Sequence, residues 1–454
     1  MTLLTKKRAH PTRRRQRPTA PRTPRHPLRA EALHGFGPWA GAALLLTCSV
    51  LLAGASARWQ GGWAETGAEL HNVLLIGVPL AAAIGCLQGG REHRRRTEEL
   101  WRTAVRGPLA RFLASALPVA LWVAAGYVLT AAGALLATWP YARGDRPHLA
   151  LLPADTVVLA ASAVAGHVAG RLTAWRPMAP LLAIAGYVAL GIPSATPDPG
   201  AGGQLNPAFP VPDAVDPVWW QPVAMAVWGA GLAGTAVLAY AARRRSTALL
   251  PLAAATVAGA LLVHTGDGLW HENPLARRQV CDTSTTPQIC VNARYGAVLP
   301  QVTEALAGVT GRLEGVRNLP VRFEDRAGAP HHDEAELPML TPLGWHLVRG
   351  RLTDPERYAW EAVSALTRRG DCARTDARTE RADDAVQNYL APSPSQKYFD
   401  DLAARGDREA RAGLKARRAA RAELASMGDK ERRAWLSAYF ASTGRCDPKG
   451  VPSL

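Results

Sequence analysis

Long apolar runs alternate with short charged clusters through residues 39–263 of the chain. A helix needs about 17–25 apolar residues to cross the roughly 30 Å hydrocarbon core of a bilayer. Seven stretches approach or meet this requirement, namely 39–57, 71–88, 109–136, 156–170, 178–192, 219–242 and 247–263. The pattern therefore predicts an all-α membrane protein, in which a polytopic bundle of about seven spans forms a transmembrane domain over 39–263.

The fourth and fifth stretches are the shortest of the seven, and Arg171 and Arg176 mark the turn between them. They form either a hairpin that crosses the bilayer twice or a pair that enters it without crossing fully. Both alternatives leave the parity of the crossings unchanged. An odd number of spans places the two ends of the chain on opposite sides of the membrane.

Basic residues in the short loops predict the orientation, because Lys and Arg stay on the cytoplasmic side. The tail over 1–38 carries ten basic side chains and one acidic one, and further basic clusters follow the second, fourth and sixth stretches. We therefore expect a basic cytoplasmic tail with an interfacial lead-in over 1–38 and an extracytoplasmic domain over 264–454. A competing hypothesis is signal-peptidase cleavage at Ala55-Ser56-Ala57, which would leave the remaining topology the same.

The segment after the last span has an amphipathic pattern. Apolar residues recur at helical spacing from Val298 to Val316, and Thr353-Asp354-Pro355-Glu356 is typical of a helix start. We expect a mainly α-helical domain with helices near 298–316, 358–368, 380–390, 394–426 with a weak point at Gly406, and 429–443, and one strand near 319–323. An Arg-rich face between 408 and 421 fits a solvated surface better than anionic lipid, and we expect no nucleic-acid partner.

The six cysteines agree with this topology. Cys48 and Cys86 lie in apolar stretches, where a buried thiol is the ordinary expectation. The other four follow the last span, and disulfides persist in oxidising compartments. Of the three possible connectivities we favour Cys281–Cys290, which closes a short loop, with Cys372–Cys446 joining distant helices. The alternative is four unpaired thiols.

Composition narrows the class of protein further. The chain has 454 residues, 53 Lys and Arg against 37 Asp and Glu, and a formal net charge of +16. Because the charges are concentrated outside the apolar runs, an ordinary soluble globule, a disordered chain and a cysteine-rich mini-protein are excluded. Six of the 53 basic residues are Lys, which suggests a GC-rich bacterial genome of the actinobacterial kind and a location in the bacterial plasma membrane.

Motifs for chemistry are absent from the sequence. It contains no Gly-x-x-x-x-Gly-Lys-Ser/Thr phosphate loop, no His-Glu-x-x-His and no Gly-x-Ser-x-Gly. We therefore expect no catalytic residue, no cofactor and no metal. Two polar clusters are weak candidates for a metal or a proton, and solvated loops are the simpler interpretation of both: His331-His332-Asp333-Glu334 with His346, and His264 with Asp267, His271 and Glu272.

Ionisable groups within membrane spans are costly and are therefore functional candidates. His167 lies inside the fourth stretch, Asp155 lies at its edge, and Arg111 is close enough to the cytoplasm for its side chain to reach water. A transporter coupled to protons or sodium usually needs more buried carboxylates than these, so the sequence weakens that hypothesis.

The loop after the second stretch is the most informative segment. Leu100, Trp101, Ala104 and Val105 share one helical face, with charged residues on the other faces and Gly107-Pro108 at the end. This pattern predicts a short cytoplasmic helix at the membrane surface. The residues that it offers to a partner are Glu92, Arg95, Arg96, Thr97, Glu98, Glu99, Leu100, Trp101, Arg102 and Arg106.

An acidic and basic lead-in, then Thr97-Glu98-Glu99-Leu100 and Pro108-Leu109-Ala110-Arg111 entering a span, resembles the coupling loop of ABC-2-type transporter permeases. The resemblance covers residues 28–245. It implies the membrane-spanning permease subunit of an exporter, driven by a separate ABC ATPase subunit that contacts this loop. It also implies a second permease chain, identical or different, within the lipid bilayer. The seventh span and the outer domain depart from the six-span plan of the family.

Two other classes of function remain open from the sequence. The chain is alternatively a membrane-anchored extracytoplasmic sensor or assembly protein, with the outer domain as its working part. A less favoured alternative is an extracytoplasmic hydrolase whose catalytic residues do not form a recognisable motif. The sequence does not identify the substrate.

Overall fold

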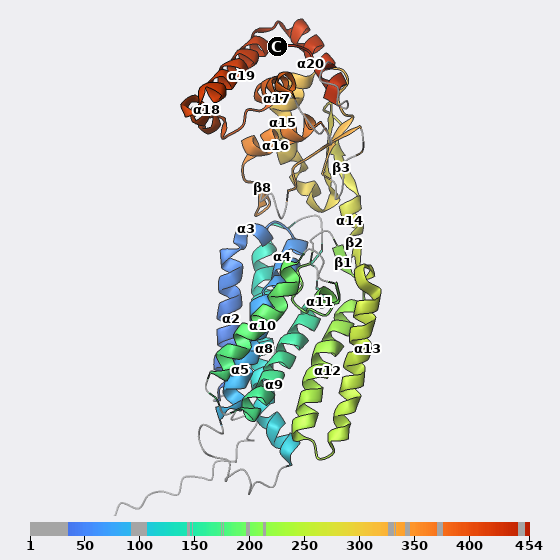
Figure 1. The fold of residues 1–454 in the computed structure, drawn as a ribbon. Coiled ribbons are helices and arrows are strands. Elements are labelled where there is room, and N and C mark those ends of the chain that lie inside the picture. Colours follow the sequence, from blue (N-terminus) through green and yellow to red (C-terminus); the bar gives the residue numbers. More distant parts are fainter. Residues whose placement is uncertain are drawn as a thin grey trace, which may run out of the picture.

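The structure is a computed structural model, and it is elongated, with a helical bundle at one end and the C-terminal domain at the other (Figure 1). It describes residues 35–91, 107–142, 146–147, 149–173, 175, 177–196, 200–211, 215–325, 331, 333–340, 346–369, 376–443 and 450–454.

Within the described ranges, seven helical segments are long and apolar enough to cross a membrane, as the sequence predicted. They are α2 (Gly37–Gly54), α4 with α5 (Trp63–Asn72 and Leu74–Gly89), α8 (Pro108–Thr138), α9 (Leu152–Leu172), α10 (Met178–Ala195), α12 (Gln221–Ala241) and α13 (Leu249–Thr265). The second span begins earlier than expected, because the ten-residue helix α4, which carries Glu65 and His71, precedes α5.

The two spans that were short in the sequence are longer in the structure. Helix α9 has 21 residues and α10 has 18, which correspond to about 32 Å and about 27 Å at a rise of 1.5 Å per residue. Both lengths suffice for a full crossing. Helix α10 is hardly covered by the rest of the bundle, with 6% of its apolar window buried.

Small residues bring α5 and α9 into close contact. A Cβ atom built on Gly85 would lie 1.9 Å from the Ala163 carbonyl oxygen, and one on Gly166 would lie 1.9 Å from the Ala82 carbonyl oxygen. The backbones of the two helices therefore touch, which is how membrane helices gain packing energy without a hydrophobic driving force. A similar approach at Gly126 joins α8 to Gly41 of α2.

The C-terminal domain contains a sheet that the sequence analysis missed. Its four strands follow the order β3-β4-β5-β6, antiparallel between β3 and β4 and parallel between the other neighbours. The strands are β3 (Gln279–Asp282), β4 (Gln288–Asn292), β5 (Arg322–Glu324) and β6 (Glu334–Glu336). The expected strand over 319–323 corresponds to β5, which begins three residues later and ends one residue later. The described part of the domain is mainly helical, as predicted, with this small sheet in addition.

The helices of this domain agree closely with the expectation. They are α15 (Leu299–Leu313), α16 (Pro355–Leu366), α17 (Ala377–Leu390), α18 (Gln396–Arg405), α19 (Arg408–Ser426) and α20 (Asp429–Thr443). The Asp354 side chain accepts a hydrogen bond from the Arg357 amide at 3.0 Å and caps α16. The break between α18 and α19 falls at Gly406, as predicted.

Short elements connect the bundle to the domain. They are α3 (Ser56–Trp59), α11 (Gly200–Gln204), β1 (Val215–Pro217), η2 (Gly266–Leu269), β2 (Trp270–Glu272), α14 (Pro274–Arg277), η3 (Ala293–Val298), β7 (Leu347–Val348) and β8 (Arg351–Leu352). The short helix η1 (Arg245–Ala248) instead links α12 to α13 at the opposite end of the bundle (Figure 1). Strand β1, which precedes α12, pairs antiparallel with β2, which follows the last span.

We expect Gly166→Ala to destabilise the bundle, because its methyl group would meet the Ala82 carbonyl oxygen. Overpacking of this kind costs about 1–3 kcal/mol. The matched control is Gly133→Ala, where nothing lies within 4 Å of the added methyl group. The melting temperature of the detergent-solubilised protein checks this prediction. It should fall for Gly166→Ala and equal that of the unmodified protein for Gly133→Ala. Equal melting temperatures for both would contradict the close contact of α5 and α9.

Candidate functional site

A cavity of about 220 Å³ lies at the end of the bundle that faces the C-terminal domain. Its walls come from α9, α11, the segment after α11, the start of α12, and η2 with the first residue of β2. In Figure 1 this region is where α11, β1 and β2 lie beside the ends of the spans. The cavity is therefore enclosed by helix ends and by the connection to the domain.

One wall of the cavity carries a buried polar triad from three different helices. The Asp155 carboxylate of α9 lies 3.0 Å from the Nδ1 atom of His71 on α4, and it accepts a hydrogen bond of 3.0 Å from the Tyr127 hydroxyl of α8. All three side chains are buried. The Phe209 backbone is a further hydrogen-bond partner of His71. Because both His71 partners are acceptors, the arrangement suits an imidazole that donates from both ring nitrogens.

Gln221 also lines the cavity. Its side chain is 5% exposed at the start of α12. Its Oε1 atom is buried and has no hydrogen-bond partner among the residues that the structure describes. A buried amide oxygen without a partner costs about 1–3 kcal/mol. Such a group in a cavity wall is therefore available to a ligand.

A second polar cluster lies further along α9. The Ser115 hydroxyl of α8 is 3.1 Å from His167 Nε2 and accepts a hydrogen bond of 3.0 Å from Arg171. His167 and Asp155 are twelve residues apart on one helix, which corresponds to about 18 Å. The two clusters therefore lie at different depths of the bundle, and a direct contact between them is excluded.

A buried ion pair joins the bundle to the C-terminal domain. Arg294 of η3 donates a hydrogen bond to the Glu65 carboxylate of α4 at 3.0 Å, and both side chains are at most 4% exposed. The Tyr295 hydroxyl donates to the same carboxylate oxygen. Removal of one partner from a buried pair is costly, because the other charge stays buried. The pair therefore fixes α4 against the domain.

A hairpin makes another polar contact between the two parts. Arg349 and Gly350 form the turn between β7 and β8 with positive φ angles of 52° and 69°, as a two-residue turn of this type requires. The Arg349 side chain donates to the Gln60 side-chain oxygen at 2.7 Å, and its amide donates to the Gln60 carbonyl at 3.0 Å.

Asp325 lies beside Arg294 at the end of β5. Burial raises the pKa of Asp325 to about 6, and the nearby Asn292 amide and Arg294 guanidinium offset the rise in part. The carboxyl group is therefore protonated in the folded protein over a pH range in which it is ionised in the unfolded chain.

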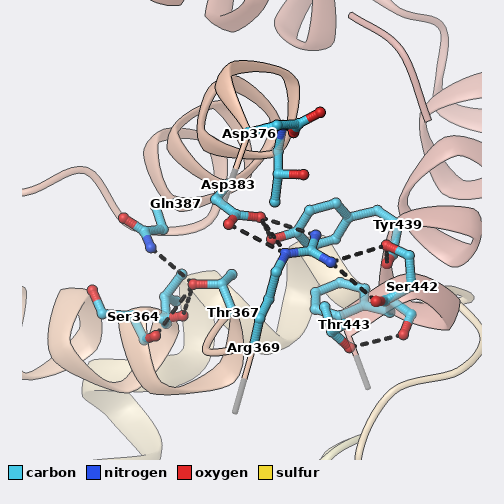
Figure 2. Close-up of polar contacts among 12 residues, drawn as sticks. Ser364, Thr367, Arg369, Asp376, Asp383, Gln387, Tyr439, Ser442 and Thr443 are labelled. Carbon is cyan, nitrogen blue, oxygen red and sulfur yellow. Dashed lines mark hydrogen bonds and ion pairs between the residues drawn. The ribbon is translucent and has the colours of Figure 1, made fainter. Parts of the chain in front are cut away.

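Figure 2 shows a polar cluster at the far end of the C-terminal domain. The Asp383 carboxylate of α17 accepts hydrogen bonds from the Arg369 guanidinium at 3.0 Å and from the Tyr439 hydroxyl of α20 at 2.6 Å. Arg369 also donates to the Ser442 carbonyl at 3.0 Å. Burial and the Asp383 carboxylate raise the pKa of Tyr439 well above its usual value, so the hydroxyl stays a donor. The cluster joins α17 and α20 and has a structural role.

The residues predicted to contact a partner all lie outside the described part of the chain. These are Glu92, Arg95, Arg96, Thr97, Glu98, Glu99, Leu100, Trp101, Arg102 and Arg106. The described chain ends at Arg91 after α5 and resumes at Gly107 before α8. The segment lies between these two spans in the sequence, and its geometry stays a prediction.

The predicted disulfide Cys281–Cys290 is confirmed and joins opposite residues of β3 and β4. Cys372 and Cys446 lie outside the described residues.

The structure does not gather the first cluster predicted from the sequence, which comprised residues 331–334 with His346, into one site. His331 contacts Glu334 at 2.9 Å, and His346 contacts Glu361 on α16 at 2.8 Å. His332 is not described. Among the described residues, no three side chains of the metal-binding types gather.

The fold separates the members of the second predicted cluster, which are His264, Asp267, His271 and Glu272. His264, His271 and Glu272 are exposed, and Glu272 pairs with Arg277 at 2.5 Å. Asp267 is also exposed, and it lines the cavity.

The sequence analysis had placed His71 at the start of a span and had not considered Tyr127 or Gln221. The sequence did contain a signal for His71, because it is a titratable residue at the end of a long apolar run. In a membrane protein such a residue usually has a buried partner.

The chain matches no protein-family profile, no curated protein and no solved structure.

We expect the stability of the protein to respond to pH through Asp325. Its folded-state pKa lies above the unfolded value of about 3.9, so its stabilising contribution is complete below about pH 4 and is lost as the pH rises through about 6. The full change is about 3 kcal/mol. The melting temperature of Asp325→Asn relative to the unmodified protein should therefore rise between pH 4 and pH 7.

The control is Asp376→Asn, which removes the charge of the residue that caps α17 and keeps a side-chain oxygen for the Thr379 amide. The Thr379 amide lowers the pKa of Asp376, so its contribution is present above about pH 4 and is lost as the pH falls further. Across pH 4–7 this variant should differ from the unmodified protein by a nearly constant amount. A constant difference for Asp325→Asn as well would contradict its raised pKa.

The prediction of a Cys372–Cys446 disulfide can be tested directly. Arg369 and Ser442 are hydrogen-bonded, and the cysteines follow them by three and four residues. At up to about 3.5 Å per residue, the chain is long enough for the two cysteines to meet. Peptide mapping of the unreduced protein should yield one cross-linked peptide containing both. Complete alkylation of both thiols without reduction would contradict the pairing.

Proposed function

We propose that this chain is the membrane-spanning permease subunit of an ABC-2-like transporter, an exporter driven by a separate ATPase subunit. The observation that carries the proposal is the charged segment 92–106, which resembles a coupling loop and joins α5 directly to α8. The sequence has no phosphate loop of its own, so the energy has to come from a partner. The proposal assigns no catalytic residue to the chain.

The packing of α5 supplies a route for the coupling. A push on segment 92–106 acts on the end of α5, whose backbone touches α9 at Gly85 and Gly166. Because no side chain lies between these two backbones at those points, α5 and α9 move as one body. Helix α9 carries Asp155 at its other end, so the motion reaches the cavity.

The orientation is part of the proposal. The basic tail and segment 92–106 lie in the cytoplasm of a bacterial cell, and seven crossings place the C-terminal domain outside. The disulfide Cys281–Cys290 supports this side, because disulfides persist in oxidising compartments. The domain receives, shields or selects the substrate.

Helix α10 is the surface that we assign to lipid and to the second permease chain. Ile184 and Ile192 are each 61% exposed and Tyr187 is 50% exposed. Such an apolar face needs either hydrocarbon or another apolar helix against it. An assembly of two permease chains around one path would use part of this face.

A sensor or assembly protein is the second candidate function. The buried Glu65–Arg294 pair favours it, because the pair links the domain to the bundle rigidly enough to pass a change in the domain to α4. A sensor needs no ATPase partner, and the two candidates differ in what copurifies with the chain.

The test is copurification of an ATPase subunit from the native membrane in a mild detergent. We expect the triple variant Arg95→Glu, Arg96→Glu, Arg102→Glu to copurify with at least about tenfold less of that subunit, because each charge reversal replaces attraction by repulsion at the contact. The matched control is the same reversal at Arg243, Arg244 and Arg245, which lie in another loop of the same side and should keep the subunit.

Both variants have to insert normally for the comparison to count, which their yield in the membrane fraction measures. Unchanged copurification after reversal in segment 92–106 would contradict the contact. Absence of any ATPase from the unmodified complex would favour the sensor.

A further inference from the structure

We propose that the cavity beside Asp155 binds a small organic cation that carries a primary ammonium group. This inference concerns the chain alone and requires no ATPase. Its test can therefore fail while the transport proposal stands, and the reverse also holds.

The charge of the cavity favours a cation. Two carboxylates line it, those of Asp155 and Asp267, and none of the described lining residues is Lys or Arg. If His71 is protonated it neutralises Asp155, and Asp267 leaves the cavity with one negative charge. If His71 is neutral, the cavity has two. An anionic ligand is disfavoured in both cases.

The uncharged polar groups favour a hydrogen-bond donor. The Gln221 side chain is 5% exposed, and its Oε1 atom has no partner within the described chain. An amide oxygen is an acceptor, and an ammonium group offers three donors. Hydrogen bonds to a charged group are roughly twice as strong as neutral ones, so a cation satisfies Gln221 better than a neutral ligand would.

The remaining walls fit the carbon part of such a ligand. Phe209, Met225 and Trp270 line the cavity, and aromatic rings add a cation–π attraction. The volume of about 220 Å³ is below the roughly 300–1,000 Å³ of sites for drug-sized molecules. The ligand class is therefore a small amine with one apolar ring or a short chain.

The probe is 2-phenylethylammonium, with the neutral 2-phenylethanol and the anionic 3-phenylpropionate as comparisons. The full chain is placed in nanodiscs of phosphatidylcholine, and binding is measured by calorimetry against empty nanodiscs. We expect the ammonium probe to bind at least about tenfold more tightly than the alcohol, in line with the charge-assisted hydrogen bonds that the alcohol lacks. The carboxylate should not bind.

Two variants assign the binding to the cavity. Gln221→Leu removes the free amide and should weaken binding of the ammonium probe at least about tenfold. Asp267→Asn removes a carboxylate at an exposed position and should weaken binding about two- to fivefold. The matched control is Gln288→Leu, the same change on β4 of the C-terminal domain, which should bind like the unmodified protein. Melting temperatures check that all variants are folded.

Weakened binding in both cavity variants, with unchanged binding in the control, would support the site. Three results would overturn it: no binding above that of empty nanodiscs, equal binding of the alcohol, or ammonium binding that neither cavity variant reduces.

Discussion

Polar side chains inside a membrane bundle have to find partners within the protein, because lipid offers none. This constraint positions the helices here. Asp155 contacts His71 and Tyr127, which fixes α4, α8 and α9 relative to one another. The Glu65–Arg294 pair meets the same requirement where the bundle joins the domain. Small residues bring the backbones of α5 and α9 into contact further along α9, towards its C-terminal end.

The sequence predicted the parts of the fold that depend on local pattern. Apolar runs, the Asp354 cap and the break at Gly406 are each determined by neighbouring residues, and the structure agrees with them. Strands β3, β4 and β6 were missed and β5 was placed only in part, because each has three to five residues and two of the pairings are parallel between separate segments. Periodicity does not identify strands that short.

The candidate site was predictable in part. Asp155 and Asp267 were named from their positions at span ends, whereas His71, Tyr127 and Gln221 were not. Their meeting depends on the crossing of α4, α8, α9 and α12, which no single segment of the sequence determines. The same dependence explains the isolation of His264 and His271, which are near Asp267 in the chain and yet exposed outside the cavity.

Every part of the functional account requires the C-terminal domain and segment 92–106 to be on opposite sides of the membrane. The most direct measurement compares two reporters fused after Leu454 in living cells, alkaline phosphatase and a green fluorescent protein. The account predicts phosphatase activity and no fluorescence, because the phosphatase matures outside and the fluorescent protein inside. Fluorescence with an inactive phosphatase would place the domain in the cytoplasm and contradict the topology.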